Sequence, residues 1–223
     1  MVSAAGFKDD VAVRIDGGTP LSAALIENVR TLCDRAEDGD LPGLVVIGVG
    51  GVPADGWTRG LSVDIVSKWE RVLRRLERLN VPTVAVASGD CGGPAADVML
   101  ATDFRIATPD TRLIVSVDQE ATWPGMSLYR LARQVGPDRI RQAALLGVPI
   151  DATEARQLGL IDEVAADPAP ALAALAERAS GIAGKELAIR RQLIFDASRT
   201  AFEDALGAHL AACDRALRRV TTS

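Results

Sequence analysis

Short apolar runs alternate with amphipathic stretches along the first half of the chain. Residues 11–15, 43–51 and 81–87 are rich in β-branched residues and have the length of buried strands. Between them, residues 21–38 and 62–79 place apolar side chains at helical spacing, and Thr19 and Pro20 stand as N-cap and first residue of the earlier helix. Because each such helix returns the chain to the same end of a sheet, the pattern predicts parallel strands.

The second half of the chain has a different pattern. Residues 103–107 and 112–116 are predicted strands separated by the turn "TPDT", and after residue 124 the pattern is helical almost throughout. We therefore predict an α/β fold, with a core over residues 1–165 and a C-terminal helical segment over residues 166–223. Asp151 is expected to cap a helix in this part of the chain, with Glu154 completing a capping box.

One helix of the C-terminal segment carries an apolar stripe that is wider than a surface helix needs. The stripe consists of Phe202, Leu206, His209, Cys213 and Leu217. It is expected to pack either in the core or against another subunit, and it favours a homo-oligomer.

A glycine-rich stretch, "SGDCGG" at residues 88–93, separates the third strand from a helix that starts at Pro94. Such a turn lets the backbone approach a ligand closely and points N–H groups at it. The spacing fits neither of the common phosphate-binding motifs, GxGxxG and GxxxxGK[ST]. The remaining use is an oxyanion site, in which main-chain N–H groups stabilise a developing enolate. Asp97, early in the helix, serves either the helix dipole or proton transfer.

Composition and charge exclude several classes of function. The chain has 223 residues, 48% of them hydrophobic and 25% charged, and a net charge of −5, which argues against a nucleic-acid groove. Basic and acidic residues alternate over one predicted helix, at Arg71, Arg74, Arg75 and Arg78 and at Glu70 and Glu77. We interpret this cluster as a solvated helix face with ion pairs along the helix.

Cysteine and histidine usage gives no sign of a metal site. Cys33, Cys91 and Cys213 are widely spaced, and His209 is the single histidine. This pattern excludes a cysteine-based zinc site and fits a reducing cytoplasm. No apolar run approaches the roughly 18 residues of a membrane span, and the first residues lack a signal-peptide core, so no membrane partner is expected.

Two segments resemble the crotonase (enoyl-CoA hydratase/isomerase) family. They are "VPTVAVASGDCGGPAADVMLATDFRIAT", at residues 81–108, and "WPGMSLYRLARQVGPDRIRQAALLGVPIDATEARQLGLIDEV", at residues 123–164. The resemblance extends over roughly residues 40–165. It implies a spiral ββα core, an acyl-CoA thioester held by two backbone N–H groups, carboxylates that move protons, and no metal or redox cofactor. It also implies a trimer or a dimer of trimers.

The family's catalytic acids carry over only in part. The first falls on Asp97, and the second falls on Val117, with Asp118 and Glu120 close behind it. The resemblance therefore implies Asp97 and Glu120 as base and acid, with Asp118 as a further catalytic candidate. Each of the two later acids is otherwise a solvated loop residue.

The family's carbonyl-binding groups also carry over in part. The deeper main-chain donor falls on Pro94, which has no N–H, so Gly93 or Ala95 is expected to take its place. Gly92 and Gly93 are the candidate thioester-binding residues of this turn. The other donor falls near Trp57. Trp123 is expected to shape the rim of the acyl pocket, with plain packing as an equal alternative.

The resemblance implies an enoyl-CoA hydratase that acts as a dehydratase on a polyketide-type acyl-CoA. Within the family, the chain most resembles the small type of protein that works beside a type III polyketide synthase in 3,5-dihydroxyphenylglycine biosynthesis. That synthase is therefore an expected partner. The alternative is a weakly catalytic accessory protein that binds the synthase and stimulates it. Pro94 and Val117 favour the alternative, whereas Asp97 and the glycine turn favour the enzyme.

Overall fold

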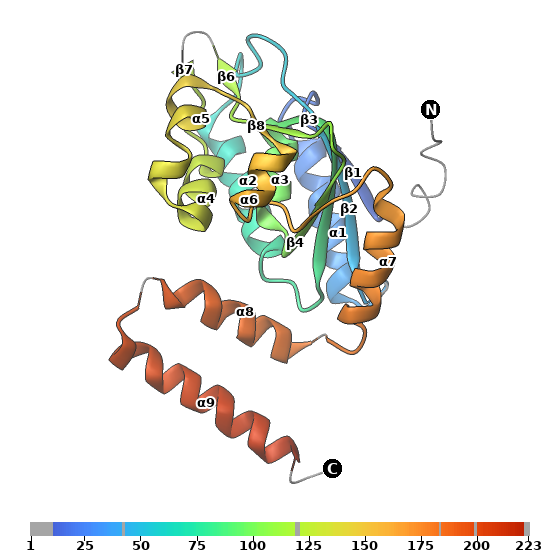
Figure 1. The fold of residues 1–223 in the computed structure, drawn as a ribbon, viewed down its shortest axis with the longest axis vertical. Helices are drawn as coiled ribbons and strands as arrows, with labels where there is room; N and C mark the ends of the chain where they lie inside the picture. The colour runs from blue at the N-terminus through green and yellow to red at the C-terminus, as the bar shows by residue number, and fades with distance from the viewer. Residues whose placement is uncertain (1–10, 42, 119–120, 183, 199, 221–223) are drawn as a thin grey trace.

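A mostly parallel sheet lies at the centre of the computed structural model, which describes residues 11–41, 43–118, 121–182, 184–198 and 200–220 (Figure 1). Its strands follow the order β1-β2-β3-β4-β9, while β5 pairs with β3 and, antiparallel, with β8. The strands are β1 (Val13–Asp16), β2 (Val45–Gly51), β3 (Thr83–Gly92), β4 (Phe104–Ala107), β5 (Arg112–Ile114), β8 (Ile150–Asp151) and β9 (Glu163–Val164). A small separate hairpin joins β6 (Val117–Asp118) to β7 (Ala121–Thr122).

The helices cover both faces of this sheet. They are α1 (Ala23–Glu37), α2 (Val63–Leu76), α3 (Gly93–Ala101), α4 (Met126–Val135), the 3₁₀ turn η1 (Pro137–Arg139), α5 (Arg141–Leu146), α6 (Ala152–Gln157), α7 (Pro168–Ala179), α8 (Lys185–Ala197) and α9 (Phe202–Val220). Among the described residues, none of them combines the length and the apolar character needed to cross a membrane.

Side chains that alternate along β2 and β3 build two apolar layers. Val45, Ile47 and Ala85 point into the main core with α1, α2 and α3. Val46 and Val84 point to the opposite face, where α7 covers them. This period of two is the signature of strands buried on both faces, and it confirms the predicted parallel α/β arrangement.

Strand β3 is longer than the sequence pattern predicts. The prediction that it ends at Ala87 is wrong, because the strand pairs with β4 up to Ala87 and then with β5 from Asp90 to Gly92. Gly89, with φ of +64°, allows the change of neighbour. The glycine stretch is therefore mostly strand, and the turn into α3 is confined to Gly92 and Gly93.

Three further expectations can be compared with the structure. The N-cap of α1 is Ser22, whose Oγ accepts from the N–H of Leu25 at 3.3 Å, so the assignment of Thr19 and Pro20 is wrong. The chain after residue 124 is not wholly helical, because β8 and β9 add to the sheet. The helix cap at Asp151 is confirmed, since its Oδ1 accepts from the N–H of Glu154 at 2.8 Å.

Helices α8 and α9 extend away from the sheet as an arm (Figure 1). Buried Arg191 fixes α8 to the core through an ion pair with Asp103 at 2.6 Å. On α9, by contrast, Phe202 is 74% exposed and Leu217 is 68% exposed. His209 is also exposed, so the predicted stripe does not lie in this chain's own core, and packing against another subunit stays as the prediction.

Candidate active site

A small pocket lies at the N-terminal end of α3, between that helix, α2, α4 and the end of β5. Its volume is about 20 Å³, which leaves room for about one water molecule. The lining residues include Trp57, Trp69, Glu70, Gly93, Pro94, Asp97, Ser116, Trp123 and Ser127. The structure therefore brings together four of the residues selected from the sequence, namely Asp97, Gly93, Trp57 and Trp123.

Asp97 is the acid of α3 in this pocket. The indole Nε1 of Trp69 donates to its Oδ2 at 2.9 Å. Burial and, to a smaller extent, the negative charge of Glu70 raise the pKa of Asp97 to about 6, while Trp69, Arg130 and the Ser127 hydroxyl act in the opposite direction. A carboxyl group with this pKa can both take and give a proton near neutral pH.

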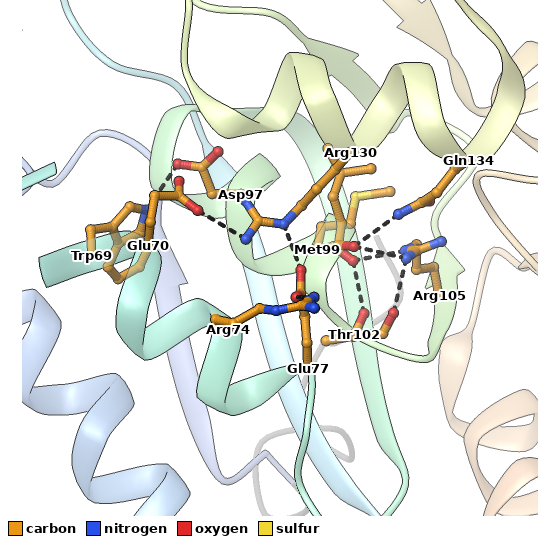
Figure 2. A network of polar contacts seen from close by, with 11 residues as sticks. Trp69, Glu70, Arg74, Glu77, Asp97, Met99, Thr102, Arg105, Arg130 and Gln134 are labelled. Carbon is orange, nitrogen blue, oxygen red and sulfur yellow. Dashed lines mark hydrogen bonds and ion pairs between the residues drawn. The ribbon is translucent and has the colours of Figure 1, made fainter. Parts of the chain in front are cut away.

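The helix that carries Asp97 is held firmly at its other end. Buried Arg105, on β4, donates from Nε to the carbonyl oxygen of Met99 at 2.7 Å and from Nη2 to that of Thr102 at 2.9 Å. These carbonyl groups lie at the C-terminal end of α3, where the Thr102 hydroxyl also donates to the carbonyl oxygen of Met99 at 2.8 Å (Figure 2). The position of Asp97 is thus set by the sheet and not by a loop.

An arginine from α4 holds two acids of α2. Arg130 contacts Glu70 at 2.9 Å through Nη2 and Glu77 at 2.7 Å through Nε (Figure 2). Burial is the largest influence on Arg130 and disfavours its charge, but Glu77 and Glu70 together raise its pKa. Arg130 is therefore a cation, and it fixes the Glu70 side chain beside Asp97.

The interpretation of this part of α2 as a solvated face is wrong for both acids. The Glu77 side chain is only 9% exposed and that of Glu70 is 21% exposed. A signal was present in the sequence: Glu70 and Glu77 lie on the same helical stripe as Leu73, which is fully buried. The arginine partner, 53 residues beyond Glu77, could not be identified from helix spacing.

The glycine turn does not present the main-chain donors that the family pattern implies. The N–H of Gly93 donates to Ser116 Oγ at 2.8 Å, and Pro94 has no N–H. Gly93 has φ of +50°, and a Cβ there would lie 2.5 Å from Pro53 Cγ, so only glycine fits. The Ser116 hydroxyl uses its oxygen for Gly93 and keeps its own proton available for an acceptor.

Trp57 offers a donor, but not the predicted one. Its main-chain N–H donates to the carbonyl oxygen of Ala54 at 3.2 Å and is therefore occupied, so a main-chain donor near Trp57 stays a prediction. Its indole Nε1 is buried and has no hydrogen-bond partner in the part of the chain that the structure describes. The ring meets that of Trp123 edge-on, with centroids 5.1 Å apart. A ligand oxygen in the pocket would satisfy this N–H.

Two of the remaining candidates, Gly92 and Asp118, lie outside the pocket. Gly92 pairs with Ile114 in the sheet and is absent from the pocket lining. Asp118 accepts from the hydroxyl of Thr58 and lines a separate surface cavity of about 480 Å³. Glu120 lies outside the described residues. Asp118 therefore does not join Asp97, and a different acid, Glu70, does.

Cys91 is close to the site but is not suited to nucleophilic chemistry. It is fully buried, and burial raises the pKa of its thiol to about 12, with a further contribution from Asp97. The thiolate form, which reacts, is therefore strongly disfavoured.

A buried acid beside hydrogen-bond donors, at a glycine turn between a strand and a helix, defines an enzyme-like pocket of the crotonase type. Residues 55–223 match the enoyl-CoA hydratase/isomerase family, and the chain belongs to that family. Over 214 residues it is 58% identical to a protein of Amycolatopsis orientalis described as an enoyl-CoA-hydratase. The matched residues make up 96% of this chain and 99% of that protein.

Solved structures support the same fold. An enoyl-CoA hydratase/isomerase from Marinobacter aquaeolei matches with a TM-score of 0.77 and 18% identity, over 92% of this chain and 87% of that one. An enoyl-CoA hydratase from Bacillus anthracis matches with a TM-score of 0.71 and 22% identity, over 91% and 86% of the two chains. The predicted crotonase fold is confirmed.

Proposed function

We propose that this protein adds water to, or removes water from, the acyl group of a coenzyme A thioester. The observation that carries the proposal is Asp97, a carboxyl group with a pKa of about 6 in a pocket of about one water volume. The hydratase-like relative supports the reaction class.

The thioester carbonyl needs donors because negative charge develops on its oxygen during the reaction. Two residues with side-chain donors line the pocket, Ser116 with its hydroxyl and Trp57 with its unpartnered indole N–H. They replace the two main-chain donors of the family pattern. One of these is lost at Pro94, and the other, the N–H of Trp57, is bound to the carbonyl oxygen of Ala54. Coenzyme A enters as part of the substrate, and this scheme uses no metal or redox cofactor.

The substrate we propose is a cyclic acyl thioester made by a type III polyketide synthase. The rings of Trp57 and Trp123 line the pocket, whose volume of about 20 Å³ must widen before a cyclohexenone-type ring can pack against them. Loss of water from such a ring leads towards an aromatic product, as 3,5-dihydroxyphenylglycine biosynthesis requires. This role, in the cytoplasm beside the synthase, rests on the sequence resemblance.

We also propose that the chain works as a trimer or a dimer of trimers, with α9 in the contact between copies. The exposed apolar residues Phe202, Leu206, Leu210 and Leu217 lie along this one helix. A surface helix does not need so many apolar residues. Light scattering at micromolar concentration tests this proposal, and a monomer would contradict it.

A second candidate function is that of an accessory protein that stimulates the synthase without catalysis of its own. Two observations favour it. Pro94 removes one main-chain donor, and Val117, where the family's second acid falls, is 45% exposed instead of lining the pocket.

The test is an assay of the purified protein on crotonyl-CoA and on the synthase product, with and without the synthase. Asp97→Asn keeps the side-chain shape and removes the base, so it is expected to lower water addition or removal by about 10²–10⁴-fold. Asp118→Asn, which changes an acid outside the pocket, is the matched control and is expected to stay near wild type. If Asp97→Asn stimulates the synthase as well as wild type and the wild type is inactive alone, the accessory function is correct.

A further inference from the structure

Two carboxylates from different helices meet in the pocket. Asp97 comes from α3 and Glu70 from α2, and both line the same cavity of about 20 Å³. Figure 2 shows their carboxylate groups next to each other, with Arg130 on the far side of Glu70. The effect of the Glu70 charge on Asp97 agrees with this proximity.

We propose that Glu70 is the second catalytic carboxylate, the partner of Asp97 in moving the protons of the reaction. The inference rests on the proposed function. In this proposal, Glu70 on helix α2 takes the role of the family's second acid, whose position in the loop after β5 is occupied by Val117 in this chain.

Glu70 is placed and held as such a residue needs to be. Its Oε2 is fixed by the guanidinium of Arg130 at 2.9 Å, and Arg130 is itself 7% exposed. Glu70 also lines a second cavity of about 440 Å³ between α2 and α4, together with Arg71 and Arg74. It therefore stands between the small pocket and a larger space from which water can reach the reacting atoms.

In the direction of water loss, the two acids have different tasks. Ionised Glu70 takes the proton from Cα, and the electron pair of that C–H bond forms the new double bond as the Cβ–O bond breaks. Protonated Asp97 gives its proton to the departing hydroxyl, which leaves as water. Exchange with solvent then returns Glu70 to the ionised form and Asp97 to the protonated form, and water addition runs through the same steps in reverse.

The groups that act on Asp97 come from three elements. Glu70 on α2 is negative and Arg130 on α4 is positive, and the side chains of Trp69 on α2 and Ser127 on α4 donate hydrogen bonds, while the neighbouring Cys91 thiol on β3 stays neutral. Removal of the Glu70 charge should therefore lower the pKa of Asp97, because the only nearby group of like charge among the described residues is lost.

The test compares Glu70→Gln with Glu77→Gln. Glu70 lies on α2, Glu77 is the C-cap of that helix, and both bind Arg130, but Glu77 does not line the pocket. We expect Glu70→Gln to lower crotonyl-CoA hydration by about 10²–10⁴-fold and Glu77→Gln to stay within about threefold of wild type. Glu70→Asp, which keeps the charge, should recover part of the activity. Urea unfolding checks that each variant is folded.

A second readout does not depend on activity. In ¹³C NMR of protein labelled at aspartate carboxyl groups, the Asp97 signal is the one that Asp97→Asn removes. It should titrate near pH 6 in wild type and in Glu77→Gln, and at lower pH in Glu70→Gln.

The outcomes separate the two proposals. Suppose that the wild type is active. If Glu70→Gln is then as active as Glu77→Gln, or if the Asp97 titration is unchanged in Glu70→Gln, the role of Glu70 is overturned and the proposed function stays intact. A wild type that is inactive on both thioesters overturns the proposed function together with the role of Glu70.

Discussion

The two sides of the pocket are built in different ways. On the acid side, Asp97, Glu70 and Arg130 come from three helices, and each makes a charged or hydrogen-bonded contact with another side chain. On the thioester side, the main-chain donors expected of the family are absent or occupied, at Pro94 and Gly93 respectively. Side-chain donors are the only free donors identified there among the described residues.

The difference shows which part of the site tolerates change. An oxyanion is stabilised by any well-placed donor, so a hydroxyl or an indole can replace a peptide N–H. Proton transfer instead requires a group with a suitable pKa, which depends on burial and on neighbouring charges. In the proposed mechanism, the acid side therefore rests on helices fixed to the sheet, and side chains supply the donors of the thioester side.

The largest effect on the thioester side is expected from Ser116→Ala. Loss of this donor should lower hydration by about 10²-fold, the usual effect of removing one oxyanion donor. Steady-state kinetics on crotonyl-CoA measures it, with Ser88→Ala, an exposed serine of β3, as the control. Unchanged or higher activity would mean that Ser116 only occupies the Gly93 N–H, which then binds the carbonyl itself.

On the acid side, Asp97→Asn should change stability with a defined pH dependence. The pKa of Asp97 rises from 3.8 to about 6 on folding, so its contribution to stability is fully present below pH 3.8 and is lost as the pH rises through 6. Asn carries no charge to bury. The variant should therefore be more stable than wild type at pH 8, by about 3 kcal/mol.

Urea unfolding at pH 8 and at pH 4 measures this difference, and at pH 4 it should be close to zero. Asp118→Asn serves as the control. Equal stability of wild type and Asp97→Asn at pH 8 would show that the carboxylate costs nothing to bury.

The smallest effect is expected from Trp57→Phe. The substitution keeps an aromatic ring and removes the unpartnered indole N–H, so hydration should fall by about tenfold. Trp123→Phe, on the other ring of the pair, should have less effect. A larger loss for Trp123 would reverse the assignment of the donor.

Much of the fold follows from local patterns in the sequence. The alternation of apolar strands and amphipathic helices predicts the parallel sheet, and the glycine turn predicts that a helix carrying Asp97 begins there. The change of partner within β3 at Gly89 was not predictable, because it depends on which strands lie beside it.

The acid side of the site was predicted only in part, for a similar reason. Asp97 can be identified as a candidate from the sequence because it follows the glycine turn, whereas Glu70 resembles any charged residue of a surface helix. Its role depends on Arg130, which is 60 residues away in the chain and meets it only when α2 packs beside α4. The hydrogen bond from the Gly93 N–H to Ser116, 23 residues away in the chain, depends likewise on a tertiary contact.

The central claim is that Asp97 and Glu70 act as one unit, and a double-mutant cycle on hydration of crotonyl-CoA tests it most directly. The variants are Asp97→Asn, Glu70→Gln and the two combined, with kcat/KM measured for each. If the acids act together, the combined variant should be about as slow as the slower single variant. If the two losses instead multiply, the acids act independently, and the account of a shared catalytic pair is contradicted.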